Sequence, residues 1–142
     1  MDRFDDLEAR LARVPLFAAL PREQRLVIAQ LATHLEAPAG EVLTREGEEG
    51  REFIVLLDGE VEVTRGGQVI ATLGPGSHFG EIALIAHGPR TATVTATTPV
   101  TVEAIGRSGF ALALAEVPGL SDDLLAAMAI RLAELDARMT TE

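Results

Sequence analysis

Glycine and proline recur at short intervals through the middle of the chain, and this spacing constrains the fold more than any other feature. They separate short apolar or alternating runs, of which 53–57, 60–64 and 68–73 are the clearest. Frequent turns between short strands are typical of an all-β sandwich or barrel. The turn residues are Pro38, Gly40, Gly47, Gly50, Gly59, Gly66, Gly67, Gly74, Gly76 and Gly80. Gly66-Gly67 stands between two predicted strands, where positive φ is accessible, and predicts a hairpin.

Helical patterns flank this β region on both sides. Apolar residues at helical spacing predict helices over 4–13 and 22–33, and further helices over 107–115 and from Ser121 onward. Residues 81–86 are apolar and short, and predict one or two helical turns inside the β region. The order is therefore helices, strands with one helical insert, and helices again.

The charge balance argues against partners that are themselves anionic polymers or surfaces. The chain has 12 basic and 22 acidic residues, a net charge of -10, and none of its basic residues is a lysine. Such a surface disfavours nucleic acid and anionic lipid unless basic residues cluster, and the arginines are scattered. An acidic protein that binds an anion must therefore concentrate positive charge at one point.

Several other features favour a cytoplasmic protein. No apolar run approaches the ~18 residues of a membrane span, and the N-terminus is charged from its second residue, unlike a signal peptide. The absence of cysteine removes disulfides, thiolate metal sites and cysteine nucleophiles. We therefore expect a single cytoplasmic domain, with no membrane or nucleic-acid partner.

The segment 79–96 contains the parts of an anion site. Gly80 allows a ligand to approach the backbone closely, and the predicted short helix begins directly after it. Unpaired backbone N–H groups at its start, near Ile82 and Ala83, favour negative charge. Nine residues after Glu81 comes Arg90, whose planar guanidinium matches two phosphate oxygens. These parts predict a phosphate site.

Glu81 would repel a phosphate and therefore needs another partner at such a site. A sugar hydroxyl is the natural one, because a hydrogen bond to a charged acceptor contributes roughly 1.5–3 kcal/mol. A phosphate group beside a sugar hydroxyl describes a nucleotide. The competing interpretation is a buried structural ion pair between Glu81 and Arg90 in a protein that binds no ligand.

The same residues carry a resemblance to a known family. The sequence FGEIALI (79–85), followed after a short loop by PRTATV (89–94), resembles the phosphate-binding cassette of cyclic-nucleotide-binding domains. This family includes regulatory subunits of cAMP-dependent kinase, bacterial catabolite activators and cyclic-nucleotide-gated channels. Residues 40–63 are similar to the family's early strands, and PLF (15–17) to its helical entry, so the resemblance covers roughly 14–138.

The resemblance implies a fold and a division of the chain. The fold is mainly β with flanking helices, namely an eight-stranded antiparallel jelly-roll-like β-roll with a cassette helix inside and a C-terminal lid helix. N-terminal helices would occupy 1–33, the β-roll 34–106 with its cassette at 79–92, and C-terminal helices 107–142.

It also implies roles for individual residues. Glu81 would bind the ribose 2′-hydroxyl, Arg90 the cyclic phosphate, and the amides of Ala83 and Thr91 would help to hold that phosphate. The β-roll would line the base and sugar pocket with Val63 and Leu73. The full set of candidate ligand-binding residues is Gly80, Glu81, Ile82, Ala83, Arg90, Thr91, Ala92, Val63 and Leu73. Ile54, where an aromatic residue is common, and the loop residues His87 and Gly88 depart from the family pattern.

The last helix carries two expectations. In the family it closes over the base, so Arg131, Leu132, Leu135 and Asp136 are candidate base contacts. It also has apolar residues at alternating spacings of three and four, which is a coiled-coil seam over two heptads. The seam consists of Leu125, Met128, Leu132, Leu135 and Met139. It could form a homodimer or simply cover the core.

The expected function is sensing of a 3′,5′-cyclic nucleotide, cAMP in preference to cGMP, through movement of the C-terminal helix. We expect no enzyme, no catalytic residue and no cofactor, and a separate effector protein that reads the signal, because no helix-turn-helix follows the last helix. His34, His78 and His87 are isolated, so no metal site is predicted. The alternatives are a ligand-free β-roll scaffold or a dimerisation module.

Overall fold

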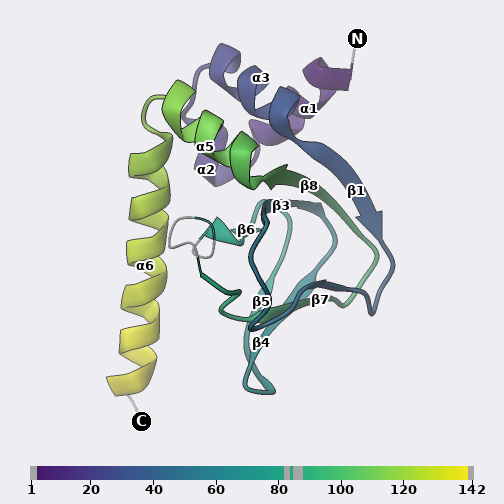
Figure 1. Ribbon diagram of the computed structural model, residues 1–142, viewed down its shortest axis with the longest axis vertical. Helices are drawn as coiled ribbons and strands as arrows, with labels where there is room; N and C mark the ends of the chain where they lie inside the picture. Colours follow the sequence, from purple (N-terminus) through teal and green to yellow (C-terminus); the bar gives the residue numbers. More distant parts are fainter. Residues whose placement is uncertain (1–2, 82–83, 85–87, 141–142) are drawn as a thin grey trace.

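The chain forms a β-roll with a layer of helices over one end and a long helix along one side (Figure 1). The computed structural model describes residues 3–81, 84 and 88–140, with side chains as far as Ile130 in the last helix. The helices are α1 (Arg3–Leu11), α2 (Pro15–Ala18), α3 (Arg22–Leu31), α5 (Arg107–Glu116) and α6 (Leu120–Thr140).

Eight strands form two antiparallel sheets of four strands each. The first sheet has the order β1 (Thr33–Ala37), β8 (Val100–Gly106), β3 (Glu52–Asp58) and β6 (His78–Phe79). The second has the order β2 (Val42–Thr44), β7 (Thr93–Ala96), β4 (Val61–Arg65) and β5 (Gln68–Leu73). This arrangement confirms the predicted eight-stranded antiparallel β-roll with flanking helices.

The central strand β3 explains why its sequence reads as an unbroken apolar run. Its side chains alternate between the two faces of the first sheet, and both faces are buried. Phe53 and Val55 belong to the apolar cluster beneath the helices, whereas Ile54 and Leu56 belong to the cluster between the two sheets. One strand therefore joins two cores.

The hairpin between β4 and β5 forms where two consecutive glycines predicted it. Gly66 and Gly67 have φ values of 58° and 81°, which residues with a Cβ rarely adopt. In the same sheet, strand β7 buries Val94 and Ala96, whereas its threonines point to the other face, as the alternation in its sequence predicts.

Two predicted helix ends are wrong, and the helix expected over 4–13 already ends at Leu11. The helix expected over 22–33 ends at Leu31, and Thr33 already begins β1, where it pairs with Ala104. Thr33 is β-branched, and its ladder to β8 replaces the last helical hydrogen bonds. The β-roll accordingly starts one residue before position 34.

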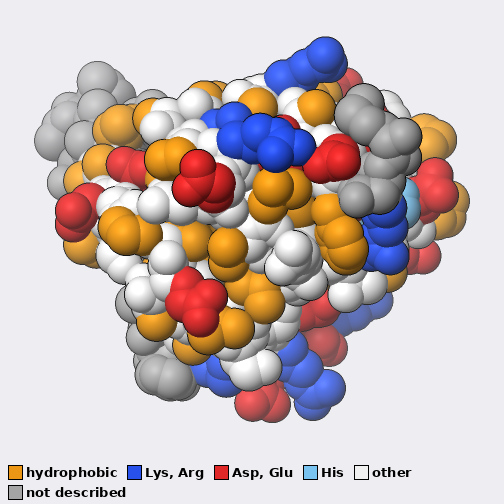
Figure 2. Space-filling view, turned by 90° about the horizontal axis from the view of Figure 1, so that it is seen from above, with side chains coloured by type: hydrophobic (Ala, Val, Ile, Leu, Met, Phe, Trp, Pro, Cys, Tyr) orange, Lys and Arg blue, Asp and Glu red, His pale blue; other side chains and the backbone are white. Residues whose placement is uncertain are grey.

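Ion pairs hold the helical layer together. Glu8 of α1 is buried and accepts a 2.7 Å hydrogen bond from Nε of Arg25 in α3, while Arg22 bonds Asp5 at 2.7 Å. Seen from above this layer, basic and acidic side chains lie next to one another among apolar ones (Figure 2). No helix within the described residues is long and apolar enough to cross a bilayer.

Candidate functional site

The backbone of Arg90 is fixed by the loop between β2 and β3. The amide of Arg90 donates to the carbonyl of Glu48 at 2.7 Å, and the amide of Gly47 donates to the carbonyl of Arg90 at 2.9 Å. An isolated antiparallel bridge joins Glu49 to Pro89 beside them. Residues of two loops far apart in the sequence thus form a short strand-like clamp from which the Arg90 side chain projects.

The side chain of Arg90 is buried against Gly80. Its Nη1 donates a 3.4 Å hydrogen bond to the carbonyl of Gly80, and only 8% of the residue is exposed. Gly80 has a φ of 96°, and a Cβ on it would overlap Nη1 and lie 2.5 Å from the carbonyl oxygen of Glu52. Glycine is therefore required here by both backbone conformation and space.

Two carboxylates oppose the cost of burying this guanidinium. Burial lowers the pKa of Arg90 from its usual value, while the negative charges of Glu52 and Glu81 raise it. An arginine remains charged in such surroundings, so the site holds a positive charge with little hydration. A group of this kind gains from an anion that reaches it.

Glu81 lies beside a histidine that looks isolated in the sequence. Its carboxylate oxygen Oε2 is 3.6 Å from Nδ1 of His78, and both side chains are buried, Glu81 to 1% exposure. The imidazole of His78 is stacked on the ring of Phe53 with centroids 5.5 Å apart. The spacing of three residues between His78 and Glu81 was the available sequence signal for this contact. The contact itself depends on the turn that the chain makes at Gly80.

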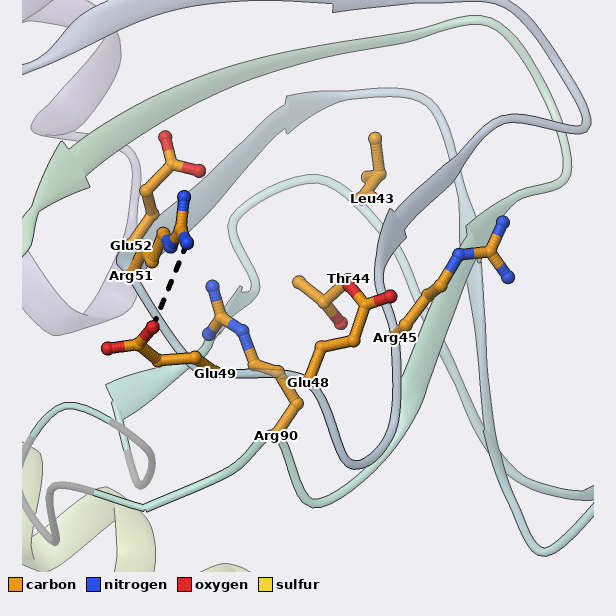
Figure 3. A pocket seen from close by; sticks show the side chains of 8 residues that line it. All are labelled: Leu43, Thr44, Arg45, Glu48, Glu49, Arg51, Glu52 and Arg90. Atoms are coloured by element: carbon orange, nitrogen blue, oxygen red, sulfur yellow. Dashed lines mark ion pairs between the residues drawn. The ribbon is translucent and has the colours of Figure 1, made fainter.

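A pocket of about 430 Å³ opens on one flank of Arg90 (Figure 3). Three arginines and three glutamates supply most of its walls, and an exposed ion pair of 3.7 Å joins Arg51 to Glu49 at its rim. The lining residues are Leu43, Thr44, Arg45, Glu48, Glu49, Arg51, Glu52 and Arg90. Of the residues predicted from the sequence, Arg90 lines this pocket, and the sequence did not point to the other seven.

The predicted pocket residues of the β-roll lie in its interior instead. Val63 is a buried member of the cluster between the sheets, and Leu73 and Ala92 pack against that cluster. Val63 pairs with Ala71 and Val61 with Leu73, so these residues face the interior from adjacent strands. Thr91 is exposed, and its carbonyl accepts a 3.0 Å hydrogen bond from Nε of Arg65.

The sequence of this β-roll matches a defined domain family. Residues 34–116 fit the description "Cyclic nucleotide-binding domain", a range that runs from the second residue of β1 to the end of α5 and includes the whole segment from Gly80 to Arg90. The chain belongs to the cyclic nucleotide-binding domain family.

Sequence relatives within this family are kinase regulatory subunits. The chain is 40% identical over 102 residues to the cAMP-dependent protein kinase regulatory subunit of Yarrowia lipolytica, and 37% identical over 115 residues to that of Emericella nidulans. These matches cover 70% and 80% of this chain but 27% and 28% of the relatives. The chain therefore spans about a quarter of the length of these proteins.

Solved structures of the family have the same fold. Cyclic AMP-bound PfPKA-R has a TM-score of 0.81 at 28% identity, and the match covers 94% of this chain and 48% of the PfPKA-R chain. The catabolite activator protein of Thermus thermophilus has a TM-score of 0.82 at 29% identity, with 89% of this chain and 62% of its own covered. The β-roll is thus shared by eukaryotic and bacterial relatives.

Part of the family's cassette and lid falls outside the described structure. Glu81 and Leu84 are helical, which agrees with the short helix predicted over 81–86, whereas Ile82 and Ala83 lie outside the described residues. The candidate base contacts Arg131, Leu132, Leu135 and Asp136 belong to the C-terminal half of α6, beyond the last described side chain at Ile130.

Proposed function

We propose that this chain binds a 3′,5′-cyclic nucleotide, with cAMP preferred over cGMP, and acts as a regulatory module. The observation that carries the proposal is the buried guanidinium of Arg90, held against Gly80 within the cassette of a cyclic nucleotide-binding domain. A desolvated arginine with weak hydrogen bonding from the protein favours a phosphate as its partner.

The charges around Arg90 support a particular side for that phosphate. The pocket on one flank carries Glu48, Glu49 and Glu52, whose carboxylates would repel an anion. Arg90 also contacts Gly80, directly before the start of the cassette helix, where backbone N–H groups favour an anion. We therefore propose that the phosphate binds between Arg90 and the cassette, with amides of Ala83 and Thr91 completing the site.

The remaining parts of the ligand follow from this position. Glu81, at the start of the same helix, would accept a hydrogen bond from the ribose 2′-hydroxyl. Val63, Leu73 and Ala92 would line the apolar interior on which the sugar and base rest. The preference for cAMP is supported by relatives named as cAMP-dependent and by neighbours with cAMP bound.

Regulation would arise from helix α6. Its first turns are anchored, because Leu120 and Leu124 are buried in the apolar cluster beneath the helices. We propose that its C-terminal half, with Arg131, Leu132, Leu135 and Asp136, closes over the bound base, and that a separate effector protein reads this movement. The domain, spanning 1–142, would act in the cytoplasm and without a catalytic residue of its own.

The test is isothermal titration of the purified chain with cAMP, cGMP and 5′-AMP. Binding of cAMP at least about tenfold tighter than cGMP, which is a difference of about 1.4 kcal/mol, is the expected result. 5′-AMP is the control, because it has the same base and ribose with an open phosphate. Binding of 5′-AMP as tight as that of cAMP would contradict recognition of the cyclic phosphate, and no binding of any of the three would refute the proposal.

A second function, assembly of two copies through α6, has support of its own. Leu125 and Ile130 on this helix are 59% and 61% exposed, although both are large and apolar. Leu125 begins the predicted heptad seam, which makes a homodimer the assembly to test. Light scattering at micromolar concentration with and without cAMP decides this point, since a 15.1 kDa species in both conditions means that the chain is a monomer.

A further inference from the structure

We infer that His78 is a positioning residue for Glu81 and thereby tunes recognition of the ribose 2′-hydroxyl. This inference rests on the proposed function, because it concerns how the same site distinguishes a ribose from a deoxyribose. It assigns a role to a side chain just outside the cassette segment 79–92.

The imidazole of His78 is held in place by burial, by strand pairing of its backbone and by aromatic stacking. Its backbone belongs to β6 and pairs with Val55 of β3, and the residue is 6% exposed. Its ring is stacked on Phe53 with an interplanar angle of 25°, and Phe53 is in turn stacked on Phe110 of α5 with centroids 5.2 Å apart. Packing on this scale fixes the rotamer of the imidazole.

From this position the imidazole faces the carboxylate of Glu81. The separation of 3.6 Å between Nδ1 and Oε2 is longer than a hydrogen bond and within the range of an ion pair. Arg90 lies within electrostatic range as well: burial lowers its pKa, and the negative charges of Glu52 and, to a smaller extent, Glu81 oppose that lowering. The ring nitrogen at 3.6 Å and the positive charge of Arg90 both act on this carboxylate, and together they bias the direction in which it points.

The direction of this carboxylate matters for the proposed contact with the ligand. A hydrogen bond to a charged acceptor is strong only when distance and angle are both good, and its strength falls steeply with misalignment. A buried carboxylate that lost its neighbour at Nδ1 would turn further toward Arg90. His78 would thus orient the carboxylate of Glu81 for the ribose 2′-hydroxyl, while touching no atom of the ligand itself.

The experiment compares cAMP with 2′-deoxy-cAMP, which lacks the hydroxyl that Glu81 would bind, in four forms of the full chain. The forms are the unaltered protein, His78→Phe, His78→Asn and His78→Gln. Phenylalanine keeps the aromatic stack on Phe53 and removes the ring nitrogen, so it is matched to the parent in packing. Asparagine places a polar nitrogen near the position of Nδ1, whereas glutamine places it about one bond further along the side chain.

We expect the unaltered protein to bind cAMP more tightly than 2′-deoxy-cAMP by about tenfold or more, the value of one hydrogen bond to a charged acceptor. His78→Phe should weaken cAMP by about fivefold and change the deoxy ligand by less than about twofold. His78→Asn should restore part of the lost margin, and His78→Gln should resemble His78→Phe. This pattern would mean that His78 affects recognition of the ribose 2′-hydroxyl and not binding of the rest of the ligand.

Other outcomes separate the inference from the function on which it rests. If His78→Phe weakens both ligands equally, the histidine is only structural and the inference is wrong. The same conclusion follows if neither His78→Phe nor His78→Gln changes the margin. Circular dichroism shows which variants are folded, and His78→Gln with His78→Asn decides the matter if the phenylalanine variant is not. If the unaltered protein binds neither ligand, the proposed function itself fails.

Discussion

Two arginines with little exposed surface in this molecule have similar surroundings and very different hydrogen bonding. In the helical layer, Arg25 donates from Nε to Glu8 at 2.7 Å and from Nη1 to the carbonyl of Leu20, with 14% of its side chain exposed. In the cassette, Arg90 donates to the carbonyl of Gly80 at 3.4 Å, which is a long contact for this class of bond. Both lie close to carboxylates.

The difference teaches how one residue type serves two purposes. Arg25 meets a carboxylate at ideal distance within the protein, so its role is complete when the chain folds. Arg90 has its charge balanced at a distance by Glu52 and Glu81, and burial still lowers its pKa. The first arrangement is a structural ion pair, whereas the long bond from Arg90 to Gly80 agrees with the proposed role of this guanidinium in binding an anion.

The largest effect that could break this comparison is loss of the cassette guanidinium. Arg90→Ala should weaken cAMP by roughly 30- to 1000-fold, or about 2–4 kcal/mol, because the phosphate loses a charged donor in a desolvated site. The free energy of unfolding should fall by about 1 kcal/mol or less. Titration calorimetry and urea unfolding measure the two quantities.

Arg51→Ala is the matched control for this variant. Arg51 lines the same pocket beside Arg90, but its side chain is 79% exposed and pairs loosely with Glu49. Exposed pairs contribute about 0–1 kcal/mol, so neither stability nor affinity should change by more than about fivefold in equilibrium constant. An Arg51→Ala variant that loses as much affinity as Arg90→Ala would place the phosphate in the pocket and not at the cassette.

The helical layer should behave in the opposite way. Arg25→Ala should lower the free energy of unfolding by about 2 kcal/mol, because Glu8 stays buried and keeps only the 3.7 Å contact with Arg22. Affinity for cAMP, measured well below the unfolding temperature, should remain within about twofold. If Arg25→Ala leaves the free energy of unfolding unchanged, the ion pair between Arg25 and Glu8 does not stabilise the fold, and its contrast with Arg90 is wrong.

The sequence was sufficient for the fold, and the reasons are local. Glycines at turn positions and the alternation in β7 are properties of neighbouring residues, so they can be recognised before any tertiary contact is known. The same holds for the spacing from Gly80 through Glu81 to Arg90, which is contained in a dozen residues. Boundaries were less certain, as Thr33 shows, because strand pairing there competes with helix propensity.

The parts that the sequence did not predict depend on contacts across the fold. The stack of His78 on Phe53 joins residues of β6 and β3, and the electrostatic effect of Glu52 on Arg90 joins the start of β3 to the loop before β7. The pocket walls likewise combine β2, the loop that follows it and the cassette. No periodicity in the chain records which side chains of different elements meet, so a histidine that contacts the key carboxylate appeared isolated.

A smaller effect should come from the glycine on which Arg90 rests. Gly80→Ala would put a Cβ into the space of Nη1 of Arg90 and should displace the guanidinium, weakening cAMP by about tenfold. Gly40→Ala is the control, because Gly40 has a φ of 93° and a Cβ added to it would meet no atom within 4 Å. Gly40→Ala should lose about 1 kcal/mol of stability from backbone strain, and Gly80→Ala should lose more, because its Cβ would also lie 2.5 Å from the backbone carbonyl oxygen of Glu52; only Gly80→Ala should lose affinity.

The smallest effect should come from shortening α6. This variant tests whether the helical layer folds without the C-terminal part of α6, and whether that part covers the bound base. Deletion from Leu132 onward leaves Leu120 and Leu124 in the apolar cluster beneath the helices, so the truncated chain should keep its thermal unfolding temperature within a few degrees. Cyclic AMP should bind about fivefold more weakly, because the base loses its apolar cover. Equal affinity in the truncated and full chains would mean that α6 is no lid, while loss of folding would mean that its last turns belong to the structural core.

Titration of the Asp136→Ala variant with cGMP and cAMP sharpens this result. If the carboxylate of Asp136 accepts hydrogen bonds from guanine, the variant should lose affinity for cGMP alone.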